Sequence, residues 1–182
     1  MTLEALAKQG HTTVYDSLAA SIGPKIREIR KEFIKESFSG FQQPEHRLET
    51  VANIHGMAFI NDSRSSNINA TWYAIESISR PIIWIVGGVE NGNDYSVVYP
   101  LVKRFVQGII CLGLDNRRIH EAFDDLCKPM ADVITMGAAV QAAYSMGNRN
   151  EVILLSPACA SFDLFENFEE RGKAFREAVK KL

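Results

Sequence analysis

In Phe59-Ile60-Asn61-Asp62-Ser63-Arg64-Ser65-Ser66-Asn67 an apolar strand end breaks into a polar loop and then opens a helix. Asn67 is a good helix N-cap, and the apolar side chains after it recur on one face until Pro81 forbids continuation. A strand, a polar loop and a helix over residues 67–79 are therefore predicted here.

The same order of strand and helix repeats along the chain. Residues 48–53 and 57–61 flank His55-Gly56, a pattern typical of a β-hairpin. Further strands are predicted at 82–86, 108–112, 132–135 and 151–155, and further helices at about 97–105, 119–126, 138–146 and 163–182. The last helix is expected to begin at a capping box of Asp163 and Glu166. The alternation predicts an α/β fold with a Rossmann-like, mostly parallel sheet flanked by helices.

Composition limits the classes of partner. The 182 residues are 46% hydrophobic, enough for a core, and 20 Lys and Arg against 22 Asp and Glu give a net charge of -2. We therefore expect neither a nucleic-acid nor a membrane partner, and a cytoplasmic protein. The three cysteines lie far apart without a C-x-x-C pair, so neither disulfides nor a metal site is expected.

Residues 1–45 follow a different pattern from the rest of the chain. Helical periodicity is interrupted at Gly23-Pro24, and residues 40–45 resemble a linker because Gly and Pro punctuate them. This N-terminal helical extension is either a helix that packs on its own domain or the trailing edge of an upstream domain.

The loop at 61–67 carries the side chains best suited to bind a ligand. Arg64 and the N-terminus of the following helix could hold an anion such as phosphate or carboxylate. Asp62 cannot serve the same anion and would instead accept hydrogen bonds from the hydroxyls of a sugar. The alternative is an ordinary capped helix start with solvated polar residues.

Two later loops are less specific. Gly87-Gly88 begins a glycine-rich loop that would let the backbone approach a ligand, although it lacks a known nucleotide signature. Ser156-Pro157-Ala158-Cys159-Ala160-Ser161 invites a nucleophile hypothesis, but the four histidines show no evident pairing with it. We instead expect Ser161 and main-chain N–H groups to bind a substrate carboxylate at the start of the last helix.

Together these motifs resemble one protein family over about residues 26–182. The motifs are His46-Arg47-Leu48-Glu49, Phe59-Ile60-Asn61-Asp62-Ser63, Asn67 with Ala70-Thr71, Gly87-Gly88 with Gly92-Asn93-Asp94-Tyr95, and Leu155 to Asp163 with Phe165, Asn167-Phe168-Glu169 and Arg171-Gly172. They are similar to the C-terminal domain of the D-glutamate-adding Mur ligases of peptidoglycan synthesis.

The resemblance implies an ATP- and Mg²⁺-dependent enzyme that joins D-glutamate to UDP-N-acetylmuramoyl-L-alanine through an acyl phosphate. ATP would be contacted by Arg47, Asn61 and Asp62, and D-glutamate by Arg64, Ser66, Ser161, Phe162 and Phe168. Residues 1–45 would then be the tail of the upstream ATP-binding domain plus the linker, and 46–182 the C-terminal domain.

Several positions depart from the family pattern. Arg64 and Ser66 stand where the family usually has lysine and threonine, and Asn91 replaces a lysine expected near substrate, which puts its contact with D-glutamate in doubt. Thr13 and Asp16 stand where the family has a pair of adenine-contacting asparagines.

The chain contains no P-loop motif, so it is expected to be a fragment without catalytic residues of its own and inactive alone. Two alternatives remain open: a non-catalytic module that binds a nucleotide or acidic ligand, and a related ligase for another amino acid.

Overall fold

The computed structural model describes residues 45–90 and 92–182. The predicted N-terminal helical extension and the doubtful contact Asn91 lie outside the described residues. The strands are β1 (Glu49–Ile54), β2 (Met57–Asn61), β3 (Ile82–Gly87), β4 (Val106–Leu112), β5 (Met130–Val133) and β6 (Val152–Ala158). The α-helices are α4 (Ile68–Glu76), α5 (Tyr99–Phe105), α6 (Arg117–Phe123), α7 (Met136–Met146) and α8 (Phe168–Val179). Two short 3₁₀ helices are η1 (Tyr95–Val97) and η2 (Asp124–Leu126).

The strands form one sheet in the order β1-β2-β6-β3-β4-β5. Only β1 pairs antiparallel, with β2, and the other neighbours are parallel. The β1–β2 hairpin turns at His55 and Gly56, with φ of 51° and 85°, values that suit a tight two-residue turn. The predicted mostly parallel α/β sheet and its hairpin are confirmed.

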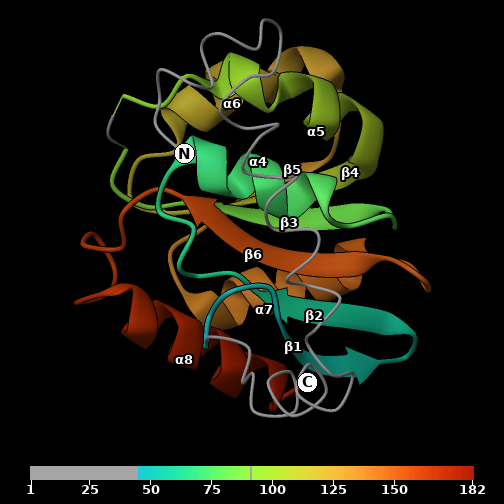
Figure 1. Ribbon diagram of the computed structural model, residues 1–182. Coiled ribbons are helices and arrows are strands. Elements are labelled where there is room, and N and C mark those ends of the chain that lie inside the picture. The colour runs from blue at the N-terminus through green and yellow to red at the C-terminus, as the bar shows by residue number, and fades with distance from the viewer. Residues whose placement is uncertain (1–44, 91) are drawn as a thin grey trace, which may run out of the picture. The chain divides into compact units, whose positions relative to one another are not determined.

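Helices cover both faces of the sheet (Figure 1). The crossovers from β2 to β5 place α4, α5 and α6 on one face of the sheet. The return from β5 to β6 places α7 on the other face, and α8, which follows β6, lies on that face too. Reversing direction while changing face keeps parallel crossovers right-handed. Each face has its own buried core, one around Trp84 and Phe123 and one around Phe59 and Phe175.

Several predicted boundaries were wrong. Helix α4 ends at Glu76 rather than at residue 79, and β5 begins at Met130 rather than at 132. Strand β6 continues through Ala158 because it keeps pairing with β3, so Ser156 lies in the strand and not in the loop after it.

The last helix also begins later than predicted. Its N-cap is Asn167, whose side chain accepts from the Glu170 N–H, and the helix starts at Phe168. The expected capping box at Asp163 and Glu166 is therefore wrong. Within the described residues, we find no helix with both the length and the apolar character needed to cross a bilayer.

Candidate functional site

The loops that follow β2 and β6 lie side by side because these strands are parallel neighbours. The Ala158 N–H donates to the Ser65 carbonyl at 3.0 Å, which fastens the start of one loop to the middle of the other. Asn67 caps α4 as predicted, with its side chain accepting from the Ala70 N–H. The two polar segments singled out in the sequence therefore form one surface.

A third segment, His46–Leu48, is tied to the loop after β2. The Arg64 N–H donates to the His46 carbonyl at 3.1 Å, and the Leu48 N–H donates to Asp62 Oδ1 at 3.2 Å. His46 and Leu48 have φ of 62° and 44°, a left-handed backbone that costs non-glycine residues of order 1–3 kcal/mol each. These contacts offset that strain and hold exposed Arg47, which lies between them, beside the loop.

A hollow of about 300 Å³ opens where these segments meet. It is lined by Arg47, Leu48, Asp62, Arg64, Ser65, Ala70, Tyr73 and Ala74. The lining includes two of the predicted ATP contacts and one of the predicted D-glutamate contacts. Two guanidinium groups beside an apolar wall suit a ligand that has both phosphate or carboxylate and a flat or apolar part.

Asp62 lies almost fully buried at the wall of this hollow. Its Oδ2 accepts from the Ser156 hydroxyl at 2.9 Å, and its Oδ1 accepts from the Leu48 N–H. Burial raises the pKa of this carboxyl, although hydrogen bonds from the Ser65 and Ser156 side chains oppose the shift. Because each carboxylate oxygen has two lone pairs, Asp62 keeps capacity to accept from a ligand hydroxyl.

Arg64 is exposed, and its guanidinium lies over the Phe168 ring at 5.6 Å from the centroid. This contact joins two of the predicted D-glutamate contacts, one from the loop after β2 and one from the first turn of α8. Ser66 is exposed on the same loop, two residues after Arg64. The cation–π contact holds the arginine head in place without satisfying its hydrogen-bond donors.

The loop after β6 holds the remaining predicted contacts. Ser161 is buried, and its carbonyl accepts from the Leu164 and Phe165 N–H groups in a tight turn, whereas Phe162 is 73% exposed. Because α8 begins only at Phe168, the expected position of Ser161 at a helix start is wrong, and its contact with a substrate carboxylate stays a prediction. The described structure does not show Ser161 or Phe162 in contact with Arg64.

Arg171 connects the two loops from inside the domain and was not predicted as a site residue. Its Nε donates to the Ser63 hydroxyl at 3.1 Å, its Nη2 to the Ser63 carbonyl at 2.9 Å, and its Nη1 to the Cys159 carbonyl at 3.0 Å. Burial lowers its pKa to about 10. The sequence feature that indicates this role is a charged residue between Phe168 and Phe175, on the core face of the last helix.

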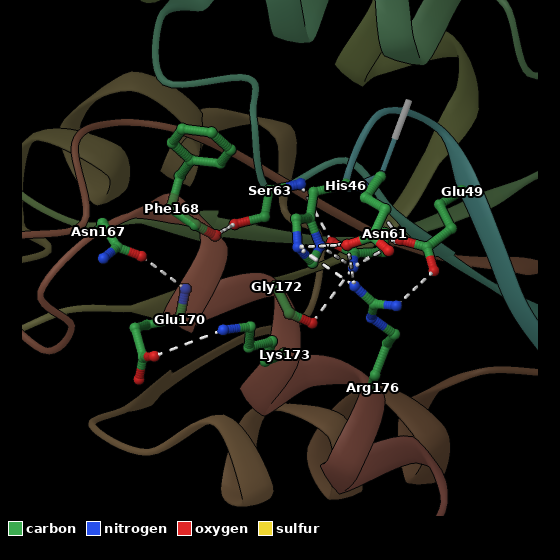
Figure 2. A network of polar contacts seen from close by, with 11 residues as sticks. His46, Glu49, Asn61, Ser63, Asn167, Phe168, Glu170, Gly172, Lys173 and Arg176 are labelled. Atoms are coloured by element: carbon green, nitrogen blue, oxygen red, sulfur yellow. Dashed lines mark hydrogen bonds and ion pairs between the residues drawn. The ribbon is translucent and has the colours of Figure 1, made fainter. Parts of the chain in front are cut away.

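A buried polar network continues from the loop toward α8 and β1 (Figure 2). Fully buried Asn61 donates through its amide to the Gly172 carbonyl at 3.2 Å and to Glu49 Oε2 at 3.3 Å, and lies 2.9 Å from His46 Nδ1. Burial, and secondarily the charge of Arg176, lower the His46 pKa. Asn61 is therefore a support of the loop, and its contact with ATP stays a prediction.

The glycine-rich loop serves chain packing. Gly88 has φ of 128°, and a Cβ there would lie 2.1 Å from the Ala160 carbonyl oxygen. A Cβ at Gly87 would meet the Leu112 carbonyl oxygen at 2.4 Å. The expected close approach exists at neighbouring backbone, at the end of β4 and in the loop after β6, and Gly88 also lines an open hollow of about 530 Å³.

No nucleophile emerges from the segment Ser156 to Ser161. The Ser156 hydroxyl is buried, donates to Asp62 Oδ2 and lies 3.0 Å from the Thr71 hydroxyl, and burial raises the pKa of the Cys159 thiol. A raised thiol pKa disfavours the reactive thiolate.

An α/β sheet whose strand-end loop brings a carboxylate, an arginine and a hydroxyl to one hollow beside Arg47 is typical of domains that bind anionic ligands. The profile of the family described as Mur ligase, glutamate ligase domain, matches residues 46–159. The chain therefore belongs to the Mur ligase family.

Similar sequences carry a more specific name. The chain is 47% identical over its whole length to a UDP-N-acetylmuramoylalanine--D-glutamate ligase of Christiangramia forsetii, and covers 41% of that protein. It is 45% identical to the protein of the same name from Bacteroides fragilis, again over 100% of the chain and 41% of the relative. The chain thus spans about two fifths of the length of these curated relatives.

Solved structures support the fold. A UDP-N-acetylmuramate-alanine ligase from Thermotoga maritima matches 92% of this chain and 35% of its own, with a TM-score of 0.55 and 12% identity. A bifunctional folylpolyglutamate synthase/dihydrofolate synthase from Yersinia pestis matches 84% of this chain and 35% of its own, with a TM-score of 0.57 and 16% identity.

Proposed function

We propose that the chain is the C-terminal, substrate-closing part of an ATP-dependent ligase that adds D-glutamate to UDP-N-acetylmuramoyl-L-alanine. Relatives of that name are 43–47% identical to it over 100% of this chain. In this proposal residues 1–45 are the tail of the ATP-binding domain and the linker, residues 46–182 are the closing domain, and the enzyme works in the cytoplasm.

The observation behind the proposal is the hollow that brings Arg47, Asp62 and Arg64 together. Arg47 contacts the ATP phosphates, and Asp62 accepts a hydrogen bond from the ribose. Arg64 binds a carboxylate of D-glutamate, an ion that a guanidinium fork can hold with two parallel bonds. Asp62 and Arg64 carry opposite charges two residues apart in one loop, and they thus serve different parts of two ligands.

The remaining contacts surround the amino acid. Phe168 packs beneath Arg64. Ser66 and Ser161 supply hydroxyls, and exposed Phe162 covers the substrate on its outer side. Asn91 stays a doubtful contact.

In the proposed reaction, the UDP-N-acetylmuramoyl-L-alanine carboxylate attacks the γ-phosphorus of ATP and ADP leaves. The D-glutamate amine then attacks the acyl carbon of the acyl phosphate, phosphate leaves, and the amine loses a proton as the amide forms. The residues described here bind and orient both ligands. Magnesium supplies charge neutralisation at the phosphates.

The described residues that line the hollow offer few ligands for Mg²⁺. Asp62 is the one carboxylate among the described residues that line the hollow, and three protein donors already occupy it. Mg²⁺ is therefore held mainly by the upstream part of the enzyme.

Amino-acid-dependent phosphate release by the full-length protein tests the proposal. We expect release that needs ATP, UDP-N-acetylmuramoyl-L-alanine and D-glutamate together. Release with L-glutamate or a diamino acid, and none with D-glutamate, would overturn the substrate assignment. No ATP turnover with any amino acid would favour a non-catalytic binding module.

A further inference from the structure

A second cluster of reactive side chains lies at the β4–β5 end of the sheet. The thiol of Cys111, the imidazole of His120 and the carboxylate of Asp132 bring one potential ligand atom each to within 4.8 Å of one another. Cys111 and Asp132 are paired across β4 and β5, and His120 comes from α6 and lies beside Asp132. Three elements of the fold therefore meet at these atoms.

We propose that Cys111, His120 and Asp132 bind one divalent transition-metal ion of the zinc class. A thiolate, an imidazole and a carboxylate together are a typical zinc donor set, and they disfavour Mg²⁺ and Ca²⁺, which prefer oxygen ligands. Sequence spacing could not reveal such a site because its ligands come from separate elements.

The distances allow a tetrahedral centre after a small adjustment. Zinc bonds of about 2.0–2.3 Å at tetrahedral angles separate ligand atoms by about 3.4–3.6 Å. His120 Nε2 lies 2.9 Å from Asp132 Oδ2, so these atoms must separate by about half an ångström. The Cys111 sulfur, within 4.8 Å of both, must move closer by at most about 1.4 Å.

Neighbouring groups orient the proposed ligands. His120 Nδ1 lies 3.3 Å from Asp124 Oδ1, which favours a proton on Nδ1 and directs the Nε2 lone pair to the ion. The Asn116 amide donates to Asp132 Oδ1 at 2.9 Å. The same side chain has a buried Oδ1 without a hydrogen-bond partner among the described residues.

The surroundings provide entry and a fourth position. A hollow of about 620 Å³ is lined in part by His120, Asp132 and Asn116, while Cys111 is fully buried behind them. A water molecule from this hollow can complete the coordination. Because a metal ion binds the thiolate, the Cys111 thiol proton passes to solvent as the metal–sulfur bond forms.

This site is separate from the proposed substrate site. Strands β6 and β3 lie between β2 and β4, which places the loop after β2 about 14 Å from the metal ligand on β4, measured across the sheet. The ion would fasten β4, β5 and α6 to one another, and its binding does not depend on the proposed reaction.

Cobalt titration of the full 182-residue chain tests the proposal, because a cobalt–thiolate bond gives a near-ultraviolet charge-transfer band. We expect one Co²⁺ per chain, the band at saturation, and its loss when Zn²⁺ is added. Cys111→Ser should abolish the band, and Cys127→Ser, which changes an exposed thiol, should leave it intact.

Two partly exposed positions keep the test decisive if Cys111→Ser fails to fold. His120→Gln should abolish tight Co²⁺ binding, and Asp124→Asn should weaken it about 10- to 100-fold. Absence of a thiolate band in the wild type, a band that depends on Cys127, or unchanged affinity in His120→Gln would each overturn the proposal.

Discussion

Arg171 provides the most demanding prediction about how the site is built. Replacing it by methionine in Arg171→Met keeps a long flexible side chain but removes three hydrogen bonds, to the Ser63 hydroxyl, the Ser63 carbonyl and the Cys159 carbonyl. The loops after β2 and β6 then lose the side chain that anchors both of them. We expect lower stability and weaker binding of D-glutamate together.

The size of the stability effect follows from two opposing terms. Leaving two buried carbonyls without their donor costs about 1–3 kcal/mol each. Removing a buried charge whose pKa has fallen to about 10 returns about 3 kcal/mol. The net loss is on the order of 1 kcal/mol, or about 2–4 °C in Tm for a domain of this size.

Thermal melting of the 182-residue chain and D-glutamate KM of the full-length enzyme are the two assays. Lys173→Met is the matched control, because Lys173 lies exposed on the same helix. Its 3.8 Å ion pair with Glu170 changes the free energy of unfolding by no more than about 0.5 kcal/mol. We expect an approximately tenfold higher KM for Arg171→Met alone. Arg171→Met with the melting temperature and KM of the control would refute the argument.

Two further predictions concern the buried network around His46. Gly172→Ala should destabilise by about 1–3 kcal/mol in chemical denaturation, because its Cβ would lie 2.2 Å from His46 Nδ1. Gly137→Ala, with open space around its Cβ, should instead stabilise by up to about 1 kcal/mol, and equal effects of the two changes would contradict this account. The His46 ring should titrate below its ordinary pKa of 6.5 in an NMR titration, so its contribution to stability is complete above 6.5 and is lost as pH falls toward the lowered folded pKa. A midpoint at or above 6.5 would show that the burial argument is wrong.

The sheet and its strand-end loops could be predicted because local signals agree there. The apolar run before Asp62, the cap at Asn67 and the turn at His55-Gly56 each determine local structure from short-range chemistry. The prediction of a site at the loop after β2 follows from the same logic, since parallel strands place these loops at one edge.

The errors arose where tertiary pairing decides the structure. Strand β6 extends past Ser156 because β3 continues to pair with it, which no local pattern specifies. The last helix starts at Phe168 because the preceding residues form a turn around Ser161 that loop packing selects. The anchoring role of Arg171 likewise depends on carbonyls far away in sequence.

The central claim is that the loop after β2 binds the amino acid and the nucleotide with separate side chains. The most direct measurement is the pair of KM values, for D-glutamate and for ATP, in full-length Arg64→Met. Losing charge-assisted bonds of about 1.5–3 kcal/mol should raise the D-glutamate KM about 10- to 100-fold and leave the ATP KM within about twofold. An unchanged D-glutamate KM, or equal increases in both values, would contradict the claim.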